Sequence, residues 1–241
     1  MTMWLFGTLV IIGALATQEV SPVLLPHVKK HEISSVNADV VHVELYYESL
    51  CPDCKNFIKE QLFPTAQKVG KIMNLTLIPF GNAKEEWDDE TSKWVFTCQH
   101  GPKECDLNLI EACAIQEIST SLTVDNLADV RNISKVQLKF IHCIENSEDP
   151  TKAPQKCAKK LDIEWSDIMD CANGERGNQI MHNYALLTEA LNPPHDSVPW
   201  IVLNGNHTDE IQSAAESDLL KLICDTYKGP NPKGCSSRSL R

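Results

Sequence analysis

Two cysteines, Cys51 and Cys54, lie where a predicted strand passes into a predicted helix, and this placement constrains the fold most. The run at 40–47 is rich in β-branched and aromatic residues, which predicts a buried strand. After Cys54, apolar residues recur at helical spacing as far as Gly70, and 75–80 predicts a second strand. A strand, a helix and a strand in this order predict a parallel βαβ unit.

A pair of cysteines separated by two residues can bind zinc, form an inert structural disulfide or act as a redox pair. Zinc needs a second ligand pair at a matching spacing, and the next cysteines, at 98, 105 and 113, do not supply one. The position between a strand and a helix favours the redox pair. We expect Cys51 at the helix N-cap as the nucleophile, because free N–H groups and the helix dipole stabilise a thiolate there. Cys54, one turn further on, is expected to be the more buried, resolving thiol.

Of the two residues between the cysteines, one favours the start of the helix and the other disfavours the thiolate. Pro52 suits the first helical position, where its missing N–H group costs nothing. Asp53 opposes a low thiol pKa, because a nearby carboxylate disfavours the thiolate unless the carboxylate is itself protonated. The sequence therefore predicts that Asp53 raises the pKa of Cys51.

A proline directly before a predicted strand, Pro199, provides the second half of the expected site. In thioredoxin-like proteins a cis-proline loop faces the cysteine pair. We expect the Val198–Pro199 bond to be cis and to present the backbone of Val198 to substrate. The alternative is an ordinary trans proline at the start of a strand.

The rest of the chain predicts helices and one further turn. Residues 82–195 resemble a long, mainly helical insertion, in which two sets of apolar residues each share a helical face. The first set is Leu107, Ile110, Ala114 and Ile118, and the second is Ile180, Tyr184, Leu187 and Leu191. After the strand that follows Pro199, Asn204 and Gly205 predict a β-hairpin, and Thr208 is expected to cap a last helix.

The N-terminal residues predict export from the cytosol. A short apolar run followed by Ala14-Leu15-Ala16 is typical of a signal peptide and its cleavage site, and no later segment is apolar enough to span a membrane. We expect a signal peptide at 1–16, a linker or pro-segment at 17–38, a thioredoxin-like domain at 39–226 and a tail at 227–241. The net charge of -11 argues against nucleic-acid binding, which needs clustered Lys and Arg.

Ten cysteines in an exported chain predict disulfide bonds. Apart from the pair at 51 and 54, eight are expected to be oxidised and structural, and their spacing does not determine how they pair. They are Cys98, Cys105, Cys113, Cys143, Cys157, Cys171, Cys224 and Cys235. The sequence also contains N-glycosylation sequons at Asn74, Asn132 and Asn206, of which we expect Asn206, beside the predicted turn, to be modified most readily and Asn74 to be less accessible.

The segment from Cys98 to Cys113 reads CQHGPKECDLNLIEAC and carries the most specific signal in the chain. It resembles the signature CQHGxxECxxNxxxxC of the gamma-interferon-inducible lysosomal thiol reductase family, with every fixed position present. The resemblance extends over roughly 40–226. It implies an α/β, thioredoxin-like fold with a long, mainly helical, disulfide-stapled insertion between the second strand and the cis-proline strand. It also implies that Cys51 attacks, that Cys54 resolves, and that the signature cysteines are structural.

The expected function is the reduction of protein disulfides, typically at acidic pH, with a small thiol or a protein as electron donor and with no cofactor and no metal. The expected location is the lysosome or the extracellular space. A disulfide oxidase or isomerase remains an alternative, because only the reduction potential separates it from a reductase. A non-catalytic binding module is a third possibility, which the presence of both cysteines opposes. In the signature, Gln99, His100, Glu104 and Asn108 are either catalytic helpers or residues that fix a turn and cap a helix, and we favour the second role.

Overall fold

The computed structural model describes residues 39–121 and 127–236, with the side chains of 127–131 left out. The predicted signal peptide, the segment at 17–38 and the last five residues of the tail lie outside this part of the chain. Within it, no helix is both long and apolar enough to cross a membrane.

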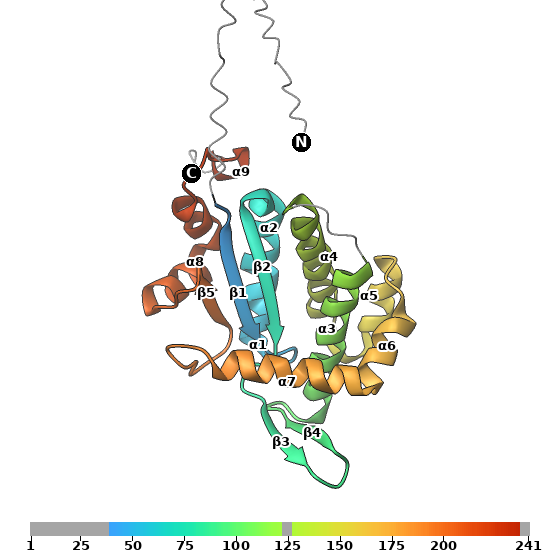
Figure 1. The fold of residues 1–241 in the computed structure, drawn as a ribbon. Coiled ribbons are helices and arrows are strands. Elements are labelled where there is room, and N and C mark those ends of the chain that lie inside the picture. The colour runs from blue at the N-terminus through green and yellow to red at the C-terminus, as the bar shows by residue number, and fades with distance from the viewer. Residues whose placement is uncertain (1–38, 122–126, 237–241) are drawn as a thin grey trace, which may run out of the picture. The chain divides into compact units, whose positions relative to one another are not determined.

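A three-stranded sheet forms the centre of the fold (Figure 1). Its order is β2 (Met73–Pro79), β1 (Val41–Tyr47) and β5 (Trp200–Leu203), with β1 parallel to β2 and antiparallel to β5. All four residues of β5 are buried, as expected for a strand covered on both faces. The predicted βαβ unit and the strand after Pro199 are therefore confirmed.

The helical segment between β1 and β2 follows the predicted span but is not a regular α-helix throughout. Its parts are α1 (Pro52–Phe57), the π-helical turn η1 (Ile58–Leu62), α2 (Phe63–Val69) and the short 3₁₀ turn η2 (Gly70–Ile72). Pro64 explains the irregularity, because it lacks an N–H group and its ring clashes with the carbonyl four residues earlier. The backbone widens there, and the N–H group of Phe63 donates to the carbonyl of Ile58, five residues back.

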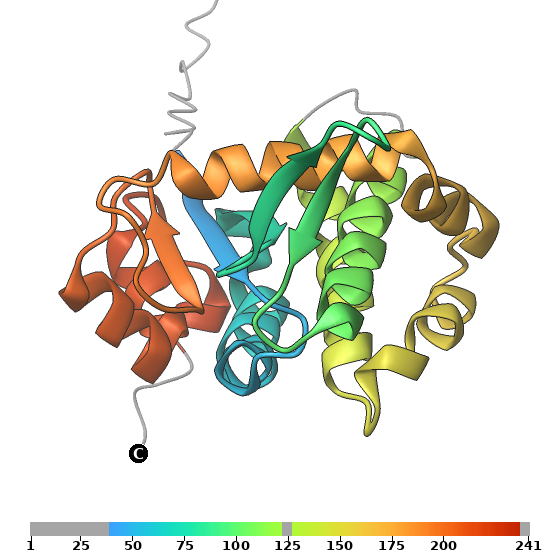
Figure 2. The ribbon, with the colours of Figure 1, turned by 90° about the horizontal axis from the view of Figure 1, so that it is seen from below.

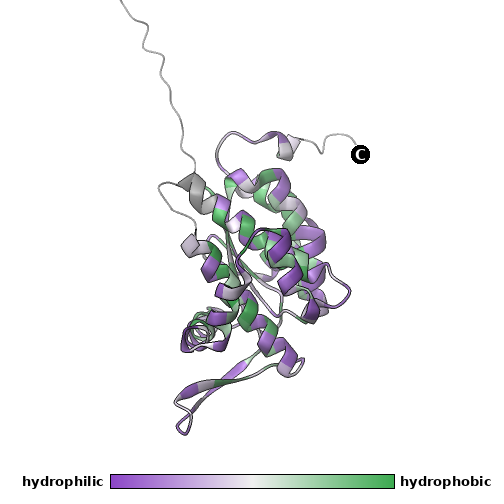
Figure 3. Cartoon of the chain, turned by 90° about the vertical axis from the view of Figure 1, so that its right-hand side faces the viewer, coloured by the Kyte–Doolittle hydropathy of each residue, from purple (hydrophilic) through white to green (hydrophobic). Residues whose placement is uncertain are grey.

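The insertion after β2 is mainly helical, as predicted, but it begins with a hairpin that the sequence did not predict (Figures 1 and 2). Its elements are β3 (Lys84–Asp88), β4 (Lys93–Thr97), α3 (Pro102–Ser121), α4 (Leu127–Glu145), η3 (Pro150–Lys152), α5 (Pro154–Lys160), α6 (Trp165–Asn173) and α7 (Glu175–Glu189). The hairpin is largely hydrophilic (Figure 3) and is held by an edge-to-face contact between Trp87 and Trp94.

Two local predictions were wrong. Asn204 and Gly205 form a tight turn with positive φ, but only a single bridge between Leu203 and Asn206 follows it, so no second strand forms. Leu187 is 48 % exposed, whereas the other three residues of its predicted face, Ile180, Tyr184 and Leu191, are partly buried against the core. The buried residues of α7 are Gly177, Met181, Ala185 and Thr188.

The chain ends in α8 (Asp209–Thr226) and α9 (Lys233–Ser236). The predicted cap of α8 is confirmed, since the Thr208 hydroxyl accepts a hydrogen bond from the N–H group of Ile211 at 3.2 Å. Asp218 has non-helical backbone angles and kinks α8. The side chain of Gln61 donates to the carbonyl of Ser217 and accepts from the N–H group of Leu219, so it satisfies backbone groups at the kink.

Four disulfides connect the helices of the insertion and the tail. Cys113–Cys171 joins α3 to α6, Cys143–Cys157 joins α4 to α5, Cys224–Cys235 joins α8 to α9, and Cys98–Cys105 spans the turn before α3. All ten cysteines lie in the described residues, and the two that remain unpaired are Cys51 and Cys54.

Two of the fully buried carboxyl groups, Glu111 on α3 and Glu145 on α4, interact with each other in the core. The Tyr47 hydroxyl donates a hydrogen bond to Glu111 at 2.8 Å. Burial raises the pKa of both carboxyl groups, and each also acts on the other. A proton on one of them allows it to hydrogen-bond to the other, so the protonated pair is the form that suits this site.

This pair predicts that the protein is more stable at acidic than at neutral pH. A carboxyl group whose pKa is raised in the folded state binds protons more tightly than in the unfolded chain, so the free energy of unfolding falls as pH rises above about 4.3. The slope is about 1.4 kcal/mol per pH unit for each group that stays protonated only in the folded state.

Chemical denaturation between about pH 5 and pH 8 tests this prediction. We expect the double variant Glu111→Gln/Glu145→Gln to lose much of the pH dependence, because an amide does not titrate. If the free energy of unfolding changes equally with pH in the wild type and the variant, the pair does not control the pH dependence of stability.

Candidate active site

Cys51 occupies the N-cap of α1, and Pro52 is the first helical residue, as predicted. The sulfur of Cys51 accepts a hydrogen bond from the N–H group of Cys54 at 3.4 Å. Cys54 is the more buried of the two, with 1 % of its surface exposed against 6 % for Cys51. A substrate sulfur therefore meets Cys51 first.

The surroundings of the two thiols separate their acidities. The pKa of Cys51 is lowered to about 7, chiefly by the hydrogen bond with the Cys54 side chain and further by the backbone N–H groups of Cys54 and Asp53, while burial opposes the shift. Burial raises the pKa of Cys54 far above its ordinary value, and the hydrogen bond with Cys51 and the charge of Cys51 add to this. Cys51 is thus the thiol that ionises first.

The carboxylate that acts against the Cys51 thiolate is Glu48, rather than Asp53 as the sequence suggested. Asp53 is exposed, and its contribution comes from its backbone N–H group, which lowers the pKa of Cys51. Glu48 is fully buried, three residues before Cys51, and its carboxylate charge raises the thiol pKa. The sequence feature that could have pointed to this role of Glu48 is its position directly after a predicted buried strand.

The loop before β5 lies against the nucleophile. The Val198–Pro199 peptide bond is cis, as predicted. The Cys51 thiol donates to the carbonyl of Val198 at 3.7 Å, which places the two halves of the predicted site in contact. The contact uses the backbone of Val198, the group that we expected to face substrate.

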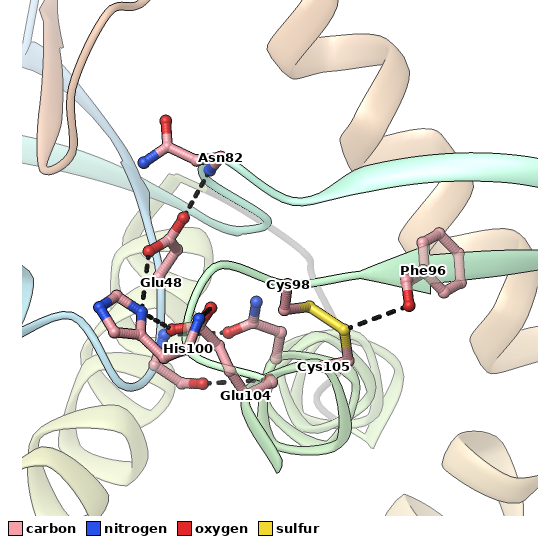
Figure 4. The surroundings of a disulfide bond; sticks show 9 residues. Glu48, Asn82, Phe96, Cys98, His100, Glu104 and Cys105 are labelled. Atoms are coloured by element: carbon pink, nitrogen blue, oxygen red, sulfur yellow. Dashed lines mark hydrogen bonds and ion pairs between the residues drawn. A yellow bond between two sulfur atoms is a disulfide. The ribbon is translucent and has the colours of Figure 1, made fainter. Parts of the chain in front are cut away.

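The signature residues connect α3 to the turn that precedes the cysteine pair (Figure 4). His100 Nδ1 lies 2.6 Å from a carboxylate oxygen of Glu104 and 3.4 Å from one of Glu48. Both carboxylates are fully buried, whereas 34 % of the His100 side chain is exposed. The backbone N–H group of Asn82 donates to Glu48 at 2.6 Å, and that of His100 donates to Glu104 at 3.0 Å.

Two further signature residues complete this connection. Buried Asn108 accepts a hydrogen bond from the backbone N–H group of Ser49 at 2.9 Å, and Gln99 accepts one from the side chain of Asn82 at 2.8 Å. The contacts agree with the structural role that we favoured for the four signature residues. These contacts fix the segment that leads from β1 into Cys51.

Glu48, His100 and Glu104 are also the group in the described residues that could hold a metal ion, with ligand atoms within 4.8 Å of one another. The 2.6 Å contact between His100 and Glu104 has the length of a charge-assisted hydrogen bond. A proton therefore fits between these two atoms better than a metal ion does.

The three sequons lie in different settings. Asn132 and Asn206 are exposed, on α4 and in the turn after β5. Asn74 is half-buried within β2, and its side chain contacts the His42 ring at 3.2 Å. Glycosylation at these sites stays a prediction.

Comparison with known proteins gives matches along most of the chain. The family model for gamma interferon inducible lysosomal thiol reductase (GILT) matches 42–161. The chain is 41 % identical over 201 residues to the gamma-interferon-inducible lysosomal thiol reductase of Carassius auratus, covering 83 % of this chain and 73 % of the relative. It is 40 % identical to that of Mus musculus, covering 82 % and 72 %. Among solved structures, a thioredoxin-like oxidoreductase from Silicibacter pomeroyi gives a TM-score of 0.43 at 10 % identity, covering 75 % of this chain and 87 % of that one.

The position of Glu48 predicts that Glu48→Gln lowers the pKa of Cys51, because the amide removes a buried charge and still accepts from Asn82. At about pH 7 we expect iodoacetamide to alkylate Cys51 about twofold to threefold faster in the variant. The difference should vanish at acidic pH, where Glu48 itself is protonated. Asp53→Asn is the matched control, and an effect of Asp53→Asn equal to that of Glu48→Gln would contradict the assignment.

Proposed function

The chain belongs to the gamma-interferon-inducible lysosomal thiol reductase family and is a thiol–disulfide oxidoreductase that reduces disulfides, and from this premise we propose that Cys51 and Cys54 are its redox pair. The observation that carries the proposal is the acidity difference between two adjacent unpaired cysteines, one of which caps a helix. The other eight cysteines form disulfides and are proposed to be structural.

The reaction begins with the Cys51 thiolate, which attacks one sulfur of the substrate disulfide. A bond forms between Cys51 and that sulfur, and the second substrate sulfur leaves as a thiolate and takes up a proton. Cys54 then loses its proton and attacks the sulfur of Cys51, which breaks the bond between Cys51 and the substrate, and the released substrate thiolate takes up a proton. The products are a Cys51–Cys54 disulfide and two substrate thiols, so two electrons pass from the enzyme to the substrate. A thiol donor, either small or a protein, returns them for the next cycle.

The raised pKa of Cys54 is compatible with this second step. Part of the shift comes from the hydrogen bond with Cys51 and from the charge of Cys51. Both are altered once Cys51 is in the mixed disulfide and carries no charge. Cys54 then ionises more readily, at the moment when its thiolate is needed.

Activity in an acidic compartment is the next part of the proposal. With a pKa of about 7, Cys51 is about 1 % thiolate at pH 5, roughly thirtyfold more than a thiol with an ordinary pKa of about 8.5. The names of the relatives, which include the word lysosomal, and the predicted signal peptide support the secretory pathway with the lysosome or the extracellular space as destination.

Two cysteine variants test the proposed mechanism. Cys51→Ser should abolish reduction of an unfolded disulfide-containing protein, because a serine hydroxyl does not ionise in this pH range. Cys54→Ser should accumulate a mixed disulfide between Cys51 and substrate, since the resolving thiol is absent. A non-reducing gel and mass mapping of the adduct provide the readout.

The same experiment includes its own control. The variants should keep all four disulfides and the wild-type circular dichroism spectrum, so that a loss of activity reflects chemistry. Most of the activity remaining in Cys51→Ser, or an adduct on another cysteine, would overturn the assignment.

A further inference from the structure

A cleft of about 410 Å³ opens beside the redox pair, between α1–η1 on one side and α8 with the loop before β5 on the other. The main-chain elements that line it lie next to one another in Figures 1 and 2. Phe57 and Pro199, both buried residues, line it, and Val198, whose carbonyl contacts Cys51, belongs to its wall. The Cys51 thiol thus contacts a residue of the cleft wall, and a chain bonded to that thiol can extend into the cleft.

The charges along the cleft have one sign. Asp53, Glu60 and Glu216 are exposed along it, and among the residues that the structure describes none of those that line it is a Lys, Arg or His. The three carboxylates come from α1, η1 and α8, so they are spread over both walls. A cationic side chain in the cleft would find an opposite charge on either side.

The wall formed by α8 is fixed to the loop that carries the cis proline. Gln212 donates to the carbonyl of Pro199 at 2.8 Å and to the carboxylate of Glu216 at 2.6 Å, and it accepts from the N–H group of Ile201 at 3.0 Å. One side chain thus connects a cleft carboxylate, the loop beside Cys51 and the start of β5. Glu216 is held in place before a substrate arrives, which lowers the entropic cost of using it.

We propose that this cleft binds the segment flanking the substrate cysteine and selects polypeptides that carry Lys or Arg beside their disulfide. The inference rests on the proposed function, because it takes Cys51 as the attacking thiol. Carboxylates in a cleft that adjoins the loop contacted by Cys51 attract a cationic flanking segment, which raises both the rate of encounter and the lifetime of the complex before attack. A second copy of this chain is a poor occupant, since its net charge is also negative, at -11.

The test uses three peptides with one disulfide each, which carry Lys, Gln or Glu at the two positions after each cysteine and are otherwise identical. The enzyme is the full mature chain, and the electron donor is dithiothreitol, which is uncharged. At about pH 6 and about 10 mM salt we expect kcat/KM for the Lys peptide to exceed that for the Glu peptide about tenfold. At about 0.5 M salt, where charges are screened, the ratio should fall to about twofold.

The carboxylates are tested with the double variant Glu60→Gln/Glu216→Gln. We expect the Lys-to-Glu ratio to drop to about threefold at low salt, because two of the three charges are gone. Glu90→Gln, at the exposed tip of the β3–β4 hairpin, is the matched control and should keep the wild-type ratio.

The outcomes separate this inference from the proposed function. If the wild type reduces all three peptides at the same rate, or if the double variant keeps the tenfold ratio, the cleft does not select charge and the inference is wrong. If the wild type fails to reduce even the Gln peptide, the proposed function itself is wrong. A ratio that favours the Glu peptide would overturn the inference and leave the redox assignment intact.

Discussion

The hydrogen bond between the N–H group of Cys54 and the sulfur of Cys51 is the interaction on which the rest of this site depends. It exists because the chain turns from β1 directly into a helix, so that Cys51 is the cap and the N–H groups of the first turn point at its sulfur. Burial of Phe57, Ile58 and Leu62 in the core keeps that helix in place. The hydrogen bond with the Cys54 side chain, together with the backbone N–H groups, lowers the pKa of Cys51, while burial raises that of Cys54, and this difference gives the two cysteines different roles.

The signature segment is distant in the sequence but contacts the turn that precedes Cys51. His100, just before α3, contacts Glu48 and is itself held by Glu104, and Asn108 accepts a hydrogen bond from the next residue, Ser49. The helical insertion therefore does more than enlarge the domain, because it fixes the segment before Cys51 and places a buried carboxylate near the thiol. Burial raises the pKa of Glu48, and the charge of its carboxylate in turn raises the pKa of Cys51.

The sequence predicted the parts of this structure that depend on neighbouring residues. The βαβ unit, Cys51 at the N-cap and the cis bond before Pro199 follow from local pattern and chemistry. The parts that it missed depend on packing between distant segments. Leu187 shares its helical periodicity with Ile180 and Tyr184, which pack against the core, yet Leu187 itself is exposed because no distant segment among the described residues covers it. Glu48 acts on Cys51 because it is buried under α3, and no spacing in the chain reports that burial.

A redox titration read by mass spectrometry tests the central claim most directly. The mature protein is equilibrated with glutathione buffers of increasing oxidised fraction, its free thiols are alkylated, and each disulfide is mapped. The account predicts that one pair alone, Cys51 and Cys54, passes from thiols to a disulfide across the series, while the four disulfides of the insertion and tail stay oxidised throughout. A second pair that titrates in the same range, or a pair at 51 and 54 that never closes, would contradict it.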